Sequence, residues 1–247
     1  MTAEDWPDAA HRLATVPGFR AEDLPDAAWA DWTMLADLAG KTVWDISEGP
    51  SLTAVTIART AAYVVASNPD EQVARCMMHA ARLSGRECFD VVASQPERVP
   101  VRPAGVDHIV LGGALERLPR DGKIERLERL AECLAPGGSL LFTADNRFSP
   151  VRSGRIRGAK LASESGYRTM LRSAGFGQVD VSYAFLDTRK PRFVASEVKG
   201  PMLRQYLDAA RQGGGLRSRL GLAWIAWAQR LGLAGTFCPA YVVRATR

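Results

Sequence analysis

The sequence predicts an α/β protein with a doubly wound, mostly parallel β-sheet and helices on both of its faces. Short apolar runs alternate with segments of helical periodicity from residue 41 to residue 144, which is the pattern of consecutive βαβ units. The apolar runs contain few alternating polar residues, which is typical of strands buried on both faces. Ligands of such sheets bind at the carboxyl ends of the strands.

Five apolar runs are predicted to be the parallel strands because they are short, rich in β-branched or aromatic residues and bounded by turn-forming residues. The run at 41–46 ends in the turn-rich segment 47–51, and the run at 62–67 is stopped by Asn68-Pro69. The five expected strands are 41–46, 62–67, 88–93, 107–111 and 139–144, and two later candidates are 179–185 and 240–244.

Helices are expected between these strands at 52–61, 70–83 and 122–134, and after them at 167–174. The helix at 70–83 has acidic residues in its first turn and Gly85 beyond its end, as helix dipoles and C-terminal capping favour. A tight turn at 135–138 is expected to close the helix at 122–134. Residues 1–38 read as short helices interrupted by prolines.

The composition excludes a disordered chain and a disulfide-stapled mini-protein, because 47% of the 247 residues are apolar and 24% are charged. We expect no metal site, since the four cysteines form no CxxC pair and only three histidines are present. The acidic, polar start of the chain is unlike a signal peptide, and no apolar run is long enough to cross a bilayer. These features predict a cytoplasmic protein with free thiols.

The order of the segments resembles that of class I S-adenosylmethionine (SAM)-dependent methyltransferases, which have a Rossmann-like fold. VWDISEGPS, at 43–51, stands where that family carries its first strand, an acidic residue and a glycine-rich turn. Serines at 47 and 51 stand where the family usually has glycine. The resemblance implies that the residues contacting the cofactor here are Asp45, Ser47, Glu48 and Gly49.

The resemblance places further cofactor contacts after the second, third and fourth strands. The family has an acid that binds the ribose hydroxyls where this chain has Asn68. An Asp that holds the adenine amino group is replaced by Ser94 or Gln95. Gly112 and Gly113 fall at the cofactor edge of the fourth strand, where small residues admit a ligand.

Two later segments resemble the family in ways that concern the fold alone. LAPGGSLLFTADNR, at 134–147, has the Leu-x-Pro-Gly-Gly turn before the fifth strand, and 166–185 matches the approach to the final hairpin. The chain is therefore expected to be one domain, 1–247, with a helical segment at 1–38, a cofactor-binding core at 39–146 and a substrate-side part at 147–247.

The activity that the resemblance implies is methyl transfer from SAM to a small molecule or glycoconjugate, most readily at an oxygen. Asp145 and Glu116 are the candidate general bases, whereas His108 is expected to be a packed strand residue. The alternative is a non-catalytic methyltransferase-like protein that serves as a partner or scaffold. It is motivated by the joint departures at Ser47, Asn68 and Ser94 or Gln95.

The second half of the chain is basic, and this charge is compatible with several kinds of binding partner. From Arg147 onward, basic residues either bind an anionic acceptor or form a solvated face. The segment 216–233 is either an interfacial membrane helix, a docking face for a protein, or a helix packed on the domain. Nucleic-acid binding is disfavoured, since a net charge of +5 is modest and no recognition motif is present.

Overall fold

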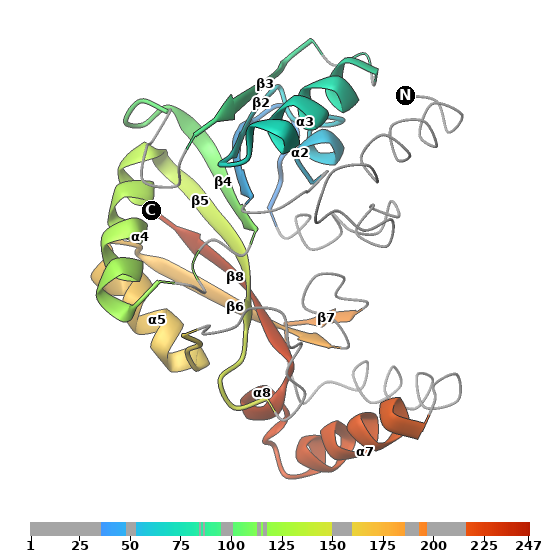
Figure 1. Cartoon of the computed structure of the whole chain (residues 1–247). Coiled ribbons are helices and arrows are strands. Elements are labelled where there is room, and N and C mark those ends of the chain that lie inside the picture. The colour runs from blue at the N-terminus through green and yellow to red at the C-terminus, as the bar shows by residue number, and fades with distance from the viewer. Residues whose placement is uncertain are drawn as a thin grey trace.

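The computed structural model forms one β-sheet flanked by helices (Figure 1). It describes residues 36–47, 53–83, 85, 87–94, 101–112, 115, 118–149, 160–185, 193–196 and 216–247. The sheet has eight strands in the order β3-β2-β1-β4-β5-β8-β6-β7. The predicted helices before residue 36 lie outside the described residues.

The first five strands are parallel, as predicted, and their carboxyl ends share one edge of the sheet. They are β1 (Thr42–Ser47), β2 (Tyr63–Asn68), β3 (Phe89–Ala93), β4 (Val106–Gly112) and β5 (Leu134–Asp145). Ile46 lies opposite both Ser67 and Leu111, and Asn68 lies opposite Ala93. This register brings the last residues of four strands together where a doubly wound sheet binds its ligands.

The last three strands are antiparallel to their neighbours. They are β6 (Gln178–Phe185), β7 (Phe193–Ala195) and β8 (Ala240–Thr246). Although β8 is the last element of the chain, it lies between β5 and β6 and pairs with both. Its first residue, Ala240, is opposite Asp145, so β8 begins at the edge where β5 ends.

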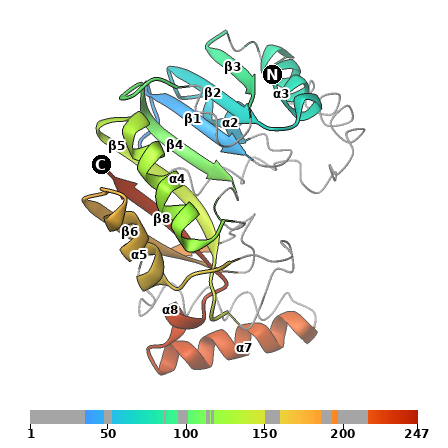
Figure 2. The ribbon, with the colours of Figure 1, turned by 60° about the vertical axis from the view of Figure 1, so that its left-hand side comes forward.

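Helices cover both faces of the sheet, as Figures 1 and 2 show. On one face are α2 (Thr53–Ile57) and α3 (Glu71–Leu83), and on the other are α4 (Arg120–Cys133) and α5 (Glu164–Ser173). Consecutive strand residues serve opposite cores: Val43 and Val110 belong to the α2/α3 core, whereas Trp44 and Ile109 belong to the α4/α5 core. Because side chains alternate between the two faces of a strand, the same strands supply apolar residues to both cores.

The turn expected at 135–138 is instead a bulge inside β5. Helix α4 ends at Cys133, and Leu134 already pairs with Val106 of β4, while Ser139 is the residue opposite His108. The intervening residues leave the ladder, with Gly137 at a φ of +77°, which favours glycine. A Cβ on Gly138 would lie 2.6 Å from the carbonyl oxygen of Asp107, so only glycine fits against β4 without a shift.

Helix α2 is shorter than the predicted 52–61, and α4 spans 120–133 instead of 122–134. Helices α3 and α5 differ from their predicted starts because of their capping residues. Helix α3 begins at Glu71, and Asp70 caps it: Asp70 Oδ1 accepts the backbone N–H of Gln72 at 2.8 Å. Helix α5 begins at Glu164, three residues before the predicted start, because the Ser163 hydroxyl oxygen accepts the N–H of Gly166 at 3.2 Å. Side-chain capping of free amide groups therefore sets both starts.

The C-terminal helices α7 (Leu216–Arg230) and α8 (Ala234–Phe237) lie beyond the edge where β5 ends (Figure 1). Ile225 of α7 and Ala234 of α8 belong to the α4/α5 core, so α7 is partly packed on the domain. Within the described residues, no helix has both the length and the apolar character that crossing a membrane requires.

Candidate functional site

The edge formed by the ends of β1 and β2 carries buried polar side chains. Asp45 is 1% exposed and lies between Ala66 of β2 and Val110 of β4 in the register of the sheet. Ser67 is also buried, and its hydroxyl accepts the indole N–H of Trp44 at 2.7 Å. Polar groups are costly to bury in an apolar sheet, so the buried Asp45 marks this edge as a candidate binding site, whereas Ser67 lies on the opposite face, where its hydroxyl is engaged with Trp44.

Asn68, at the end of β2, forms a local turn. Its side-chain oxygen accepts the backbone N–H of Asp70 at 2.9 Å, and the side chain is fully buried. The turn leads directly into helix α3, whose first turn Asp70 caps. Asn68, to which the family resemblance assigns the ribose contact, thus lies at the end of β2, and its oxygen is part of the link between strand and helix.

The other predicted cofactor residues that the structure describes lie at the same edge. The backbone N–H of Ser94 donates to the carbonyl oxygen of Asn68 at 3.2 Å, which holds the end of β3 against β2. Gly112 is opposite Ser47 at the ends of β4 and β1. The structure therefore brings Asp45, Ser47, Asn68, Ser94 and Gly112 together, whereas Glu48, Gly49, Gln95, Gly113 and Glu116 lie outside the described residues.

The end of β5 carries Asp145, the predicted base, followed by a structural asparagine. Asn146 is 1% exposed, and its amide nitrogen donates to the carbonyl oxygens of Thr236 at 2.8 Å and Cys238 at 2.9 Å. Its side-chain oxygen accepts the N–H of Phe148 at 3.0 Å. Asn146 therefore joins the end of β5 to the start of β8 and holds Asp145 at this edge.

Three tyrosines and a cysteine pack behind the end of β5. Tyr167 and Tyr241 meet edge to face with ring centroids 6.2 Å apart, and the hydroxyl of Tyr183 donates to Glu164 at 3.0 Å. Burial, aided by the Glu164 contact, raises the pKa of Tyr183 to about 12, and burial raises the pKa of the Cys238 thiol to about 12. Tyr183 and Cys238 stay protonated near neutral pH, which disfavours Cys238 as a nucleophile. Tyr167 is a core residue, since it is only 1% exposed.

His108 is a core residue, as predicted. It is 7% exposed, and its Nδ1 lies 2.8 Å from the hydroxyl oxygen of Ser139 in the adjacent strand. Loss of hydration on burial lowers its pKa despite the nearby Asp107 carboxylate. Because it pairs with Val43 near the start of β1, it is remote from the strand ends.

A cavity of about 470 Å³ lies beside the end of β5. It is lined by the first turns of α4 and α5 and by residues that flank the segment 150–159. Its basic lining residues are Arg120, Lys123, Arg147 and Lys160, and its polar lining includes Ser163, Ser165 and Thr169. Such an arrangement can bind an anion.

Sequence reasoning identified only part of this cavity. Arg147 and Lys160 belong to the predicted basic stretch, whereas Arg152, Arg155 and Arg157 of that stretch lie outside the described residues. Arg120 and Lys123 were missed because they lie in helix α4, about forty residues from α5 along the chain. The sequence feature that could have indicated them is the pair of basic residues in the first turn of the helix that follows the fourth strand.

Comparison with known proteins finds similarity in structure alone. No protein-family model and no curated protein matches the sequence. The structure is similar to a SAM-dependent methyltransferase from Thermotoga maritima described as a possible histamine N-methyltransferase, with a TM-score of 0.57, 15% identity, and coverage of 98% of this chain and 97% of that chain. It is also similar to a SAM-dependent methyltransferase from Aquifex aeolicus, with a TM-score of 0.57, 14% identity and coverage of 97% of each chain.

Another similar structure is the [4+2]-cyclase SpnF, with a TM-score of 0.56, 16% identity, and coverage of 90% of this chain and 80% of that chain. The comparisons together show that this chain has the class I methyltransferase fold. They confirm the predicted fold class, and at these identities they concern the fold alone.

Proposed function

We propose that the protein transfers a methyl group from SAM to an oxygen of a small-molecule or glycoconjugate acceptor that carries negative charge. The observation that carries this proposal is the alignment of Asp45, Asn68 and Gly112 at adjoining strand ends in a class I methyltransferase fold. Bound SAM supplies a methyl group already activated on sulfur. The protein then has to bind and align the two reactants and to exclude water.

The residues at this edge suit SAM in their chemistry. Asn68 offers a carbonyl oxygen with two lone pairs, one of which accepts the Asp70 N–H, and the other suits one ribose hydroxyl. Because Asn68 is fully buried, a ribose can reach it only if the turn from Asn68 to Asp70 shifts. Gly112 leaves room at the neighbouring strand end, where a larger side chain would project.

Asp145 is the proposed general base for a hydroxyl acceptor. A hydroxyl must lose its proton as it attacks the methyl group, and a carboxylate at the end of a strand can accept it. Asp145 is half-buried, and the hydrogen bonds of Asn146 fix the backbone that follows it. Glu116, the other proposed base, lies outside the described residues.

The second candidate is a protein of the same fold that does not transfer methyl groups. The buried state of Asn68 and the serines at 47 and 94 favour it, because each replaces a residue with which the family contacts its cofactor. The similarity to a [4+2]-cyclase shows that this fold also occurs in a protein described by another reaction. In this case the edge would serve a different ligand or a partner protein.

Calorimetric titration of the full chain with SAM and with its demethylated product distinguishes the two candidates. Micromolar binding, with the product bound as tightly or more tightly, supports a methyltransferase and justifies a screen of anionic hydroxyl acceptors. An Asp145→Asn variant should then retain SAM binding and lose transfer, whereas the exposed Asp180→Asn control should retain both. No binding up to millimolar SAM would favour the second candidate.

A further inference from the structure

We propose that the cavity between helices α4 and α5 binds a phosphate group, and that this phosphate belongs to the methyl acceptor. The binding of phosphate stands on the cavity itself, whereas its assignment to the acceptor rests on the proposed function. The cavity volume of about 470 Å³ falls within the range of small-molecule sites, so it admits a phosphate together with an attached organic group.

The positive charge of the cavity lining is the first reason to expect a bound phosphate. The described lining contains four basic side chains and no carboxylate: Arg120, Lys123, Arg147 and Lys160. Cations gathered around one space repel each other, and a bound anion offsets that repulsion. A phosphate carries nearly two negative charges and three strong acceptor oxygens, so it matches four surrounding cations better than a carboxylate, which has one charge and two oxygens.

The burial of Lys123 is the second reason. This side chain is 2% exposed, its ammonium group donates to the carbonyl oxygen of Lys160, and it lies 5.8 Å from the centroid of the Tyr167 ring. These contacts hold a charged group in a fixed place at the cavity wall and also tie the Lys160 backbone to α4. The positive charge is thus positioned before any ligand arrives, which reduces the entropic cost of binding.

Helix geometry is the third reason. The first turns of both α4 and α5 line the cavity, and the amino-terminal end of a helix carries partial positive charge. Pro119 caps α4 with no side-chain hydrogen bond, so no capping side chain takes up the free amide groups of that turn. Ser165 adds a hydroxyl from α5 to the same space, whereas the Thr169 hydroxyl already donates to the Ser165 carbonyl oxygen at 2.9 Å.

The position of the cavity links it to the reaction. Arg147 is two residues beyond Asp145, and its backbone N–H donates to the Ala162 carbonyl oxygen at 3.2 Å. That bond joins the end of β5 to the segment 160–163, which leads into α5. A phosphate held here would anchor an acceptor next to the proposed base.

The test is calorimetric titration of the full chain with inorganic phosphate and pyrophosphate at low ionic strength, where charge contacts are least screened. Arg120→Gln and Lys160→Gln should each weaken pyrophosphate binding about tenfold, the usual effect of losing one charge-assisted contact. Arg129→Gln is the matched control, because Arg129 is an exposed residue of α4 whose partner is Glu125, away from the lining. It makes the same change in net charge and should alter binding less than twofold.

Absence of phosphate and pyrophosphate binding, or equal weakening by Arg129→Gln, would overturn the proposal. Lys123→Met is an additional variant whose folding is checked by thermal unfolding; the two surface variants decide the question if it does not fold. Soluble sugar phosphates and phosphatidic acid vesicles are compared to identify the source of the phosphate. Binding of either ligand that is weakened by Arg120→Gln supports the site. Stronger binding of the soluble sugar phosphate supports a small-molecule acceptor, whereas stronger binding of the vesicles does not.

Titration with SAM in the same samples separates this inference from the proposed function. Phosphate binding without SAM binding would uphold the anion site and reject its assignment to a methyl acceptor. SAM binding without phosphate binding would reject the anion site and leave the methyltransferase proposal standing.

Discussion

At the scale of single residues, Asn68 is the position where a small change has the clearest expected effect on cofactor binding. Its oxygen accepts the Asp70 N–H, and a carboxylate oxygen at the same place can do so equally well. Asn68→Asp adds a second strong acceptor for the ribose and should tighten SAM binding about fivefold or more, because a charged acceptor in place of a neutral one contributes about 1 kcal/mol. Calorimetry of the two proteins measures the change.

The control for Asn68→Asp is Gln72→Glu, which adds the same charge at an exposed position in the first turn of α3. That variant should leave SAM affinity unchanged. If Gln72→Glu tightens binding as much as Asn68→Asp, the effect comes from general charge. Unchanged affinity in Asn68→Asp would remove this residue from the ribose site.

His108 should make stability depend on pH. Burial lowers its folded-state pKa, while Asp107 opposes that effect and Lys41 and Arg244 add to it. The unfolded chain then binds more protons, so the His108 contribution is present above the ordinary value of about 6.5 and is lost as the pH falls through it. His108→Gln should therefore reduce the loss of unfolding free energy between about pH 7.5 and about pH 5.5.

Urea denaturation at each pH measures this difference, and subtraction of the two proteins removes the carboxylate contribution that they share. Equal slopes for the two proteins would contradict the assigned environment of His108. The His79→Gln variant is a useful comparison, because His79 lies on α3 at an only partly buried position.

At the scale of elements, the bulge at the start of β5 depends on the absence of a side chain at Gly138. A Cβ there would lie 2.6 Å from the Asp107 carbonyl oxygen and 2.8 Å from the Ala135 carbonyl oxygen, both backbone atoms. Gly138→Ala should lower the free energy of unfolding by about 1–3 kcal/mol, as other overpacked sites do. Gly177→Ala is the matched control, since a Cβ there meets nothing within 4 Å.

Denaturant unfolding of both glycine variants gives the comparison. The Gly177→Ala protein should remain within about 0.5 kcal/mol of the parent, as surface substitutions usually do. A Gly138→Ala protein as stable as the parent would mean that α4 and β5 join with more space than the structure shows.

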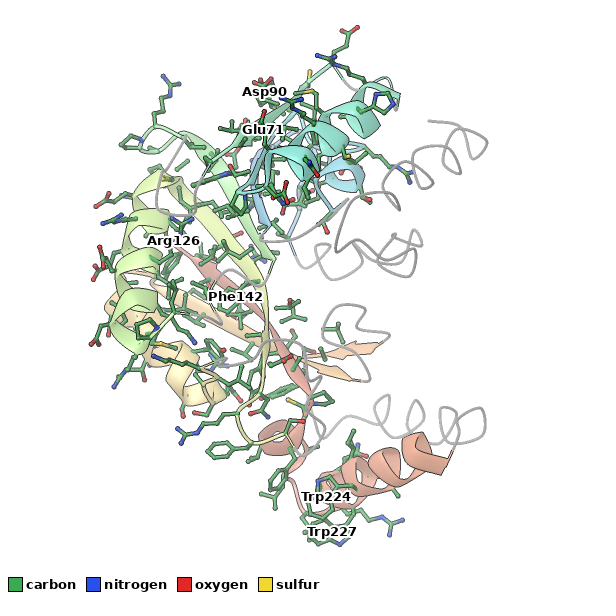
Figure 3. All side chains as sticks on the ribbon, viewed as in Figure 1. Glu71, Asp90, Arg126, Phe142, Trp224 and Trp227 are labelled. Carbon is green, nitrogen blue, oxygen red and sulfur yellow. The ribbon has the colours of Figure 1, made fainter. Side chains whose placement is uncertain are left out.

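Helix α7 presents an apolar surface that the core does not use. Trp224 is 41% exposed and Trp227 is 49% exposed, their ring centroids are 5.0 Å apart, and Figure 3 shows both at the outer side of α7. Ile225 and Ala228 occupy its buried side. Aromatic side chains beside a basic residue such as Arg230 favour contact with an anionic membrane surface.

Co-sedimentation with vesicles tests this contact. The parent chain should sediment with anionic vesicles and remain in the supernatant with zwitterionic ones, and a Trp224→Ala/Trp227→Ala double variant should lose the anionic binding. Failure of the parent to sediment would leave α7 as a helix packed on the domain. Thermal unfolding of the double variant verifies that its fold persists.

At the scale of the whole molecule, the sequence predicted what depends on local pattern. The five parallel strands were found because their apolar runs end in turn residues, and the strand-end site followed from the topology of such a sheet. The placement of β8 between β5 and β6 requires pairing with segments far away in the chain, which periodicity does not encode. The basic cavity likewise depends on two helices that meet only after folding.

Because β8 lies in the middle of the sheet, the fold should depend on residues 240–247. Ala240, Tyr241, Val242, Val243 and Ala245 are each 0–1% exposed, and β8 supplies hydrogen bonds to strands on both of its sides. Removing residues 240–247 would expose both neighbouring edges and empty part of both cores, at a cost comparable to the whole stability of a domain.

We therefore expect the chain that ends at residue 239 to lose its cooperative thermal transition, as circular dichroism would detect. Removal of Arg247 alone is the control, because it leaves β8 intact. It deletes the backbone hydrogen bond to Gly138 at 3.0 Å and the guanidinium contacts with the carbonyl oxygens of Glu132 and Leu134. That shorter truncation should keep a cooperative transition with a loss of about 1–3 kcal/mol, the net value of these few hydrogen bonds. A cooperative, native-like transition in the longer truncation would show that the sheet closes without β8. Because β8 follows both β5 and β6 along the chain and pairs with both, the β5–β8–β6 part of the sheet can be completed only once residues 240–246 are present.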